Sequence, residues 1–217
     1  MTLRYDPRTA LVVVDVQNDF ADPGGGLYVA GGEQVVPVVN EHAAAAAEAG
    51  AVVVCTQDWH PADTPHFAKD GGTWPVHCVQ GTWGAELHPG LTERGPVVRK
   101  GSNGEDGYSG FSMRHPVSGE TVPTELAELL GRSGVTRVVI CGLATDYCVK
   151  QTALDARSHG YPTTVLEDAI RAVDLEPGDG DRAVEEMLAA GVMLESRGRG
   201  RGASGSADGS PVQNASD

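Results

Sequence analysis

Short apolar runs rich in valine recur along the chain, and they alternate with segments of helical periodicity. Each run is continuous rather than alternating, and each is bounded by glycine or polar residues. Runs of this kind are typical of strands that are buried on both faces of a parallel sheet. We therefore predict strands at residues 11–15, 51–56, 97–101, 137–141, 163–168 and 192–194.

The segments between these runs have features of helices, such as an alanine-rich stretch closed by glycine and leucines at helical spacing. The predicted helices cover residues 33–50, 124–134 and 181–191, with a further helix that ends near Gly160. Strands that alternate with helices favour an α/β fold. We predict one three-layer α/β/α domain with a mostly parallel central sheet over residues 1–197, followed by a disordered Gly/Ser-rich tail at residues 198–217.

Composition narrows the range of functions. The 217 residues carry a formal charge of −14, with a pI near 4.8, which argues against a nucleic-acid partner and leaves a small-molecule substrate. The four cysteines lack paired spacing, and no secretory segment is recognised, so we expect a reducing, cytoplasmic location. No apolar run approaches transmembrane length, so no membrane association is expected.

Three chemically useful side chains fall at or just past the ends of predicted strands. Asp15 and Lys100 each close a strand, and Cys148 follows another in what we expect to be the first turn of a helix. In parallel sheets, ligands bind outside these strand ends, so the three can meet as base, cation and nucleophile. The helix terminus would lower the pKa of the thiol. Singly, each also fits a structural role: turn residue, solvated charge or core cysteine.

A second cluster lies in residues 57–95, a Pro- and Gly-rich region without sustained periodicity, and loops of this length tend to be functional. It contains Asp58, His60, His66 and His77. A carboxylate with imidazoles is a ligand set for Zn, Mn or Fe(II), although a histidine-rich loop can also be merely polar. Cys78 beside His77 is a conceivable ligand, but we favour it as a core residue.

Several of these segments together resemble one known family. They are Asp15 in Val-Asp-Val-Gln-Asn-Asp-Phe, Asp58-Trp59-His60-Pro61, Trp74-Pro75-Val76-His77-Cys78, Lys100-Gly101, and Gly142-Leu143-Ala144-Thr145-Asp146-Tyr147-Cys148-Val149. In this order they resemble the isochorismatase-like cysteine hydrolases, and within them the nicotinamidase and pyrazinamidase branch. The resemblance covers roughly residues 8 to 195 and leaves out the tail.

The resemblance implies roles for individual residues. It implies a catalytic triad of Asp15, Lys100 and Cys148, and a cis peptide bond before Ala144 that directs the N–H groups of Ala144 and Cys148 at an oxyanion. It further implies one divalent metal ion, Zn, Mn or Fe, held by Asp58, His60 and His77, with His66 a ligand that only some members share. Aromatic positions that line the substrate pocket of the family match Phe20, Trp74 and Tyr108.

The activity implied by the resemblance is deamidation of nicotinamide, and of pyrazinamide, to the acid and ammonia through a cysteine thioester, as used in NAD salvage. The metal would hold the pyridine nitrogen rather than activate water. Members occur as monomers and as oligomers, so a homo-oligomer stays open. Two alternatives remain: a metal-free relative acting on another small amide or an isochorismate-type vinyl ether, and a non-catalytic α/β scaffold that binds a partner protein.

Overall fold

The computed structural model describes residues 3–92 and 95–196, and the predicted tail at residues 198–217 lies outside the described residues. Six parallel strands form the central sheet in the order β3-β2-β1-β6-β7-β8. They are β1 (Thr9–Val14), β2 (Val52–Asp58), β3 (Val97–Lys100), β6 (Arg137–Leu143), β7 (Thr163–Arg171) and β8 (Met193–Glu195). Each of the six predicted strands is therefore present in the sheet.

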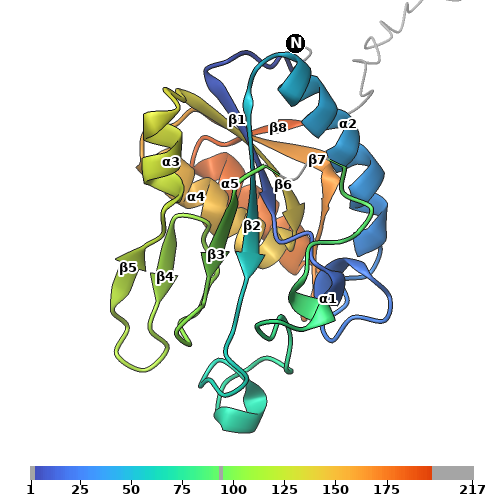
Figure 1. The fold of residues 1–217 in the computed structure, drawn as a ribbon, viewed down its shortest axis with the longest axis vertical. Coiled ribbons are helices and arrows are strands. Elements are labelled where there is room, and N and C mark those ends of the chain that lie inside the picture. The colour runs from blue at the N-terminus through green and yellow to red at the C-terminus, as the bar shows by residue number, and fades with distance from the viewer. Residues whose placement is uncertain (1–2, 93–94, 197–217) are drawn as a thin grey trace, which may run out of the picture.

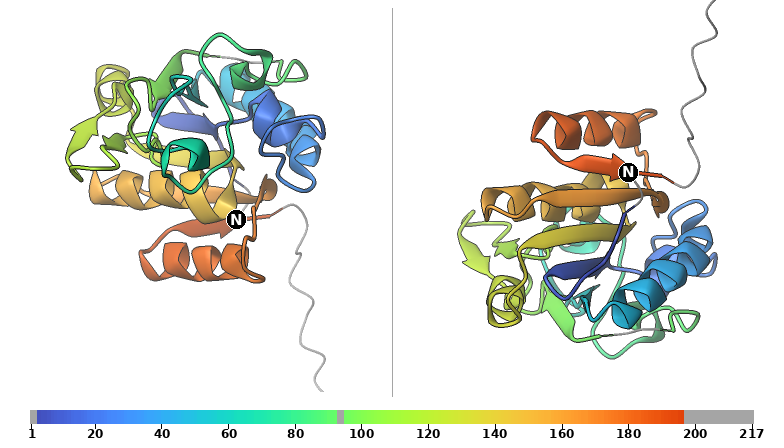
Figure 2. Two further views of the ribbon diagram at one scale, coloured as in Figure 1. Left: turned by 90° about the horizontal axis from the view of Figure 1, so that it is seen from below. Right: turned by 90° about the horizontal axis from the view of Figure 1, so that it is seen from above.

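Helices cover both faces of the sheet, which gives the predicted three layers (Figure 1, Figure 2). The α-helices are α1 (Asn18–Ala21), α2 (Val35–Glu48), α3 (Leu126–Arg132), α4 (Lys150–Ser158) and α5 (Asp179–Ala189). Short 3₁₀ turns lie at η1 (Gly32–Gln34), η2 (Ala68–Asp70) and η3 (Trp83–Ala85), and a π-helical turn, η4 (Thr145–Val149), precedes α4. The architecture is therefore α/β/α, as the alternation of patterns predicts.

Strand β1 shows how the apolar runs build two cores, because successive side chains of a strand point to opposite faces. Leu11 and Val13 pack in the cluster that contains the apolar face of α2. Val12 and Val14 pack in the other cluster, with residues of α3, α4 and α5. All six residues of β1 are buried, so a continuous apolar run is what this central position requires.

The region after β3 differs from the sequence prediction. The polar stretch after β3, predicted to be a loop, contains β4 (Ser112–Arg114), which pairs with β5 (Thr121–Pro123) in an antiparallel hairpin beside the main sheet. This hairpin is half-exposed and lacks a clear apolar alternation, so its pattern is weak. The long region after β2 is a loop region, as predicted: it has only short helical turns and isolated bridges, and it lies beyond the carboxyl end of β2 (Figure 1).

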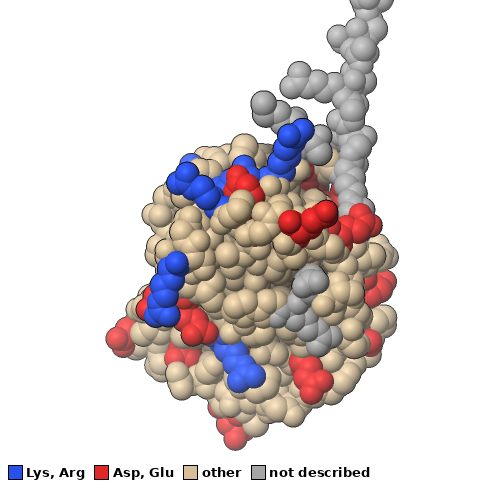
Figure 3. All heavy atoms as spheres, turned by 45° about the horizontal axis from the view of Figure 1, so that its top comes forward, with Lys and Arg blue, Asp and Glu red and all other residues tan. Residues whose placement is uncertain are grey.

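The surface and the helices add two observations. On the face shown in Figure 3, acidic and basic side chains are interspersed, with uncharged surface between them. Within the part of the chain that the structure describes, no helix is both long and apolar enough to cross a membrane.

Gly142 near the end of β6 has φ +118°, and a Cβ atom there would lie 2.0 Å from the carbonyl oxygen of Val14. We expect Gly142→Ala to lower the free energy of unfolding by about 2–4 kcal/mol, because it adds backbone strain and a core clash. The matched control is Gly131→Ala in α3, where a Cβ meets nothing within 4 Å. Denaturant titration should show Gly131→Ala to be neutral or stabilising; an equal loss in both variants would contradict the prediction.

Candidate active site and metal centre

The three predicted triad residues meet at the carboxyl edge of the sheet. Lys100 Nζ lies 2.7 Å from Asp15 Oδ2 and 3.6 Å from Cys148 Sγ. Asp15 and Lys100 are fully buried, and Cys148 is 7% exposed. Because β1, β2, β3 and β6 are parallel neighbours, their carboxyl ends deliver these side chains to one place. The structure thus brings together a carboxylate, an ammonium and a thiol that are far apart in the sequence.

Asp58 is the second carboxylate beside Lys100. It is paired with Lys100 across β2 and β3, and Lys100 Nζ donates both to Asp58 Oδ1 and to the carbonyl oxygen of Gly107. The main chain of Asp58 is held by Gln17, whose Oε1 accepts from Asp58 N at 2.8 Å and whose Nε2 donates to Asp58 O at 2.8 Å. One buried cation is therefore shared by two carboxylates in a rigid setting.

Burial and charge set the proton distribution among these groups. Burial acts to lower the pKa of Lys100, but Asp15 and Asp58 outweigh it and raise that pKa well above its usual value. Burial raises the pKa of Asp15 despite the opposing effect of Lys100. Burial also acts to raise the pKa of Asp58, but Lys100 and His60 outweigh it, so this pKa lies below its usual range. Lys100 is thus the fixed positive charge of the group.

The expectation for the Cys148 thiol is wrong in one respect. Cys148 lies, as expected, in the first turn of a helix, the π-helical turn η4 that leads directly into α4, but the pKa of its thiol is not lowered. Burial raises the pKa of the thiol well above its usual value, and nearby Asp15 adds to this, although Lys100 acts in the opposite direction. Desolvation of the thiolate outweighs the favourable charges. The resting group is therefore a thiol, and it needs a base before it can act as a nucleophile.

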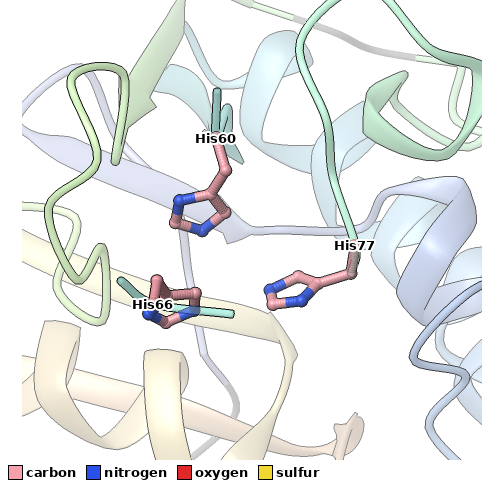
Figure 4. Close-up of side chains that lie close together, drawn as sticks. All are labelled: His60, His66 and His77. Carbon is pink, nitrogen blue, oxygen red and sulfur yellow. The ribbon is translucent and has the colours of Figure 1, made fainter. Parts of the chain in front are cut away.

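Three histidines from the region after β2 converge on one point. His60, His66 and His77 each offer a ring nitrogen, and these atoms lie within 4.8 Å of one another. Figure 4 shows the three rings turned toward a common space. All three are buried, and the rings of His60 and His66 stack with their centroids 4.5 Å apart. These are the three histidines that the sequence analysis grouped, with Asp58, as candidate metal ligands.

The chemistry of this cluster fits a divalent metal ion. Both ring nitrogens of His60 are buried without a hydrogen-bond partner among the described residues, which is rare in folded proteins. His77 Nδ1 lies 2.7 Å from the carbonyl oxygen of Pro75, so it donates there and leaves Nε2 free. Burial lowers the pKa of His77 to about 4, which keeps the imidazole neutral near pH 7. Neutral imidazoles with free nitrogens are metal ligands.

Asp58 lies between the histidine cluster and the triad. Its Oδ2 is 3.8 Å from His60 Nε2, while its Oδ1 accepts from Lys100. A ligand atom of Asp58 also lies within 4.8 Å of those of Asp15 and Cys148. Asp58 therefore lies beside the histidine cluster and also belongs to the group that contains the Cys148 thiol.

Aromatic side chains enclose a small cavity above Cys148. The three aromatic residues that the sequence singled out, Phe20, Trp74 and Tyr108, all line it. Trp74 Nε1 donates to the Tyr108 hydroxyl at 2.8 Å, and burial raises the pKa of Tyr108 to about 12, so the phenol stays neutral. His66, His77 and Cys148 line the same cavity. A flat aromatic molecule bound there would contact both the thiol and the histidines.

Sequence reasoning missed several residues of this site, among them Tyr147, Gln17 and Asp106. Tyr147 lines the cavity and packs edge-on against Trp74, with ring centroids 4.8 Å apart. Its position directly before Cys148 is a signal that could have identified it. Gln17, which holds Asp58, and Asp106, whose Oδ1 lies 2.6 Å from His66 Nδ1, act through contacts between distant segments. No spacing rule in the sequence reveals such contacts.

The turn that follows β6 has the conformation that the resemblance implies. The Leu143–Ala144 peptide bond is cis, although the second residue is not proline. Ala144 lines the cavity beside Cys148. The structure therefore places the main chain of Ala144 at the reactive thiol.

The fold and the site define a three-layer α/β protein with a buried cysteine at the carboxyl edge of a parallel sheet. A model described as "Isochorismatase domain" matches residues 9–197, and the chain belongs to the isochorismatase family. The expected family and fold class are thereby confirmed.

Individual relatives are similar over most of their length. The nicotinamidase of Escherichia coli (strain K12) is 39% identical over 206 residues, which cover 87% of this chain and 94% of that protein. The pyrazinamidase of Pyrococcus horikoshii, solved in complex with zinc, is 43% identical, with a TM-score of 0.77 and coverage of 88% and 99%. The PnC1 of L. infantum, solved in complex with nicotinate, is 38% identical, with a TM-score of 0.81 and coverage of 90% and 96%.

Proposed function

We propose that this protein is a nicotinamidase, an amidohydrolase that converts nicotinamide to nicotinate and ammonia and also accepts pyrazinamide. One observation carries the proposal: the Cys148 thiol and two histidines of the metal-like cluster line the same aromatic cavity. In a heteroaromatic carboxamide, the carboxamide can face the Cys148 thiol while the ring nitrogen faces the histidines. The similarity to nicotinamidases and to a nicotinate-bound structure supports the assignment.

The proposed reaction begins with a proton transfer from the Cys148 thiol to Asp15, and Lys100 compensates the charge at both groups. The thiolate attacks the carboxamide carbon, while the N–H groups of Ala144 and Cys148 stabilise the oxyanion, each worth about 2.7–4 kcal/mol. Asp15 then returns its proton to the departing ammonia, which leaves an acyl thioester on Cys148. Water, activated by Asp15, hydrolyses the thioester to the carboxylate and restores the thiol.

We further propose that Asp58, His60 and His77, with His66, hold one divalent ion, either Zn, Mn or Fe(II). The bound ion would accept the pyridine nitrogen and so fix the carboxamide over Cys148. Phe20 and Trp74 would flank the ring, and Tyr108 would complete the wall through its hydrogen bond with Trp74. In this assignment the protein side chains break and form the covalent bonds, and the metal ion would only position the substrate.

Metal removal tests this function. Protein purified without a histidine tag is treated with a chelator, and ammonia release from nicotinamide is measured before chelation, after it, and after addition of Zn²⁺, Mn²⁺ or Fe²⁺. We expect chelation to raise the KM for nicotinamide strongly, because ring positioning is lost, and one of the metals to restore it. A panel that includes pyrazinamide and an aliphatic amide without a ring nitrogen provides the comparison.

Two outcomes would contradict the assignment. Full activity of the metal-free protein on an aliphatic amide, with none on nicotinamide, would favour the metal-independent relative. Absence of ammonia release from every amide, with the metal loaded, would favour a binding scaffold. Two observations argue against both alternatives. Asp15, Lys100 and Cys148 are all present and adjacent, and both ring nitrogens of His60 are buried without a hydrogen-bond partner in the described part of the chain.

A further inference from the structure

The carboxylate of Asp106 lies against the ring of His66, forty residues away in the sequence. His66 Nδ1 is 2.6 Å from Asp106 Oδ1, the histidine is 4% exposed, and the side chain of Asp106 is 18% exposed. A carboxylate only accepts hydrogen bonds, so Nδ1 is the nitrogen that carries the proton. In the neutral imidazole, the Nε2 atom of His66 then keeps a free lone pair.

Asp106 is itself held in place by the hairpin strand β4. Its main-chain N–H donates to the carbonyl of Arg114 at 2.7 Å, and the N–H of Arg114 donates back to Asp106 at 3.0 Å. The next residue, Gly107, accepts a hydrogen bond from Lys100. The carboxylate thus projects from a segment that is held by hydrogen bonds at Asp106 and at Gly107.

A second contact ties the His66 loop to the same segment. The Thr64 hydroxyl donates to the carbonyl of Gly104 at 3.0 Å, and the N–H of His66 donates to the Thr64 hydroxyl at 3.2 Å. The main chain and the ring of His66 are therefore both oriented by residues 104–106.

The three histidines differ in what orients them. A main-chain carbonyl, that of Pro75, fixes His77, whereas both ring nitrogens of His60 lack a hydrogen-bond partner among the described residues. Of the three, His66 is the one whose ring is oriented by a carboxylate. Carboxylate partners fix the tautomer of a metal-bound histidine and raise its basicity, and their loss typically weakens metal affinity by about 10–100-fold.

We propose that Asp106 is a positioning residue that makes His66 a metal ligand in this chain. The proposal rests on the metal site of the proposed function but not on its substrate. Asp106 touches neither the thiol nor the proposed substrate position; it acts through the His66 ring. Its contribution is to direct Nε2 of His66 toward the point that the three histidines share.

The test measures the Zn²⁺ affinity of the metal-free protein by competition with a chromophoric chelator, without any substrate. We expect Asp106→Ala to weaken binding by about 10–100-fold. Asp106→Asn should weaken it much less, because the amide oxygen still accepts from Nδ1. His66→Ala should weaken it at least as much as Asp106→Ala, and the double variant should lose no more than His66→Ala, as expected for residues that act through one contact.

Asp63→Ala is the matched control, because its carboxylate is exposed and contacts Lys69 rather than a histidine. Unchanged Zn²⁺ affinity in Asp106→Ala, or an equal loss with and without His66, would overturn the proposal. Nitrogen NMR of the wild-type imidazoles needs no variant, and a proton on Nε2 of His66 in the metal-free protein would also overturn it. Failure to deamidate nicotinamide would leave these measurements unaffected and would concern only the proposed function.

Discussion

Cys148→Ala is expected to reduce the rate of nicotinamide deamidation by about 10⁴-fold or more, because the covalent route is lost with the nucleophile. The side chain is small and buried, so the cavity should persist and the variant should still bind nicotinate. Ammonia release gives the rate, and calorimetry with nicotinate gives the binding. Mass spectrometry of acid-quenched wild-type protein should locate the acyl group on the peptide that contains Cys148.

Cys78→Ala is the matched control for this prediction. Cys78 is also buried and adjoins His77, but its thiol packs in the core. Its short polar contacts are made by the main chain, whose N–H donates to Asp19 Oδ2 at 2.6 Å and whose carbonyl accepts from the N–H of His60 at 3.0 Å. Alanine keeps that N–H, so most of the activity should remain. Similar rates for wild type and Cys148→Ala, or an acyl group on Cys78, would refute the proposed nucleophile.

Lys100→Met is expected to have the largest effect on stability. The substitution leaves Asp15 and Asp58 buried and facing each other without a cation, and breaking a buried ion pair in this way costs about 3–5 kcal/mol. Deamidation should also be lost, since the thiolate and Asp15 no longer have a compensating charge. Denaturant unfolding of the metal-free protein measures the first effect, and ammonia release measures the second.

The pH dependence provides an internal check on this variant. Burial already raises the pKa of Asp15 with Lys100 present, and removal of the cation raises it further. A carboxyl whose pKa is higher in the folded than in the unfolded state lowers the free energy of unfolding at a pH above its unfolded-state pKa. The stability that Lys100→Met loses should therefore shrink as the pH falls. The control is Lys69→Met, an exposed lysine paired with Asp63 and Asp70, which should cost less than about 1 kcal/mol. Equal losses in both variants would contradict the prediction.

Much of this arrangement could be predicted from the sequence because the relevant signals are local. A continuous apolar run such as that of β1 marks a central strand, and a polar residue directly after it must emerge at the strand's carboxyl end. Parallel strands share that edge, so Asp15 and Lys100 could be placed together without coordinates. The histidine cluster was visible for the same reason, since it directly follows β2.

The features that could not be predicted depend on contacts between distant segments. The pKa of Cys148 is set by how completely the folded chain removes water from the thiol, and position in a helix is a poor guide to that. The hairpin of β4 and β5 is half-exposed, so no strong apolar pattern marks it. The contact of Asp106 with His66 joins two polar loops, and both residues are of types that loops commonly contain.

The position of Asp58 between Lys100 and His60 limits how the proposed metal site can change over evolution or by engineering. A residue without a carboxylate at position 58 would alter the ligand set, and it would also leave Lys100 with one carboxylate instead of two. Metal preference and thiol chemistry cannot be adjusted separately at that position. The three histidines do not carry this constraint, so they are the positions at which a different metal can be selected while the charge balance around Cys148 is kept.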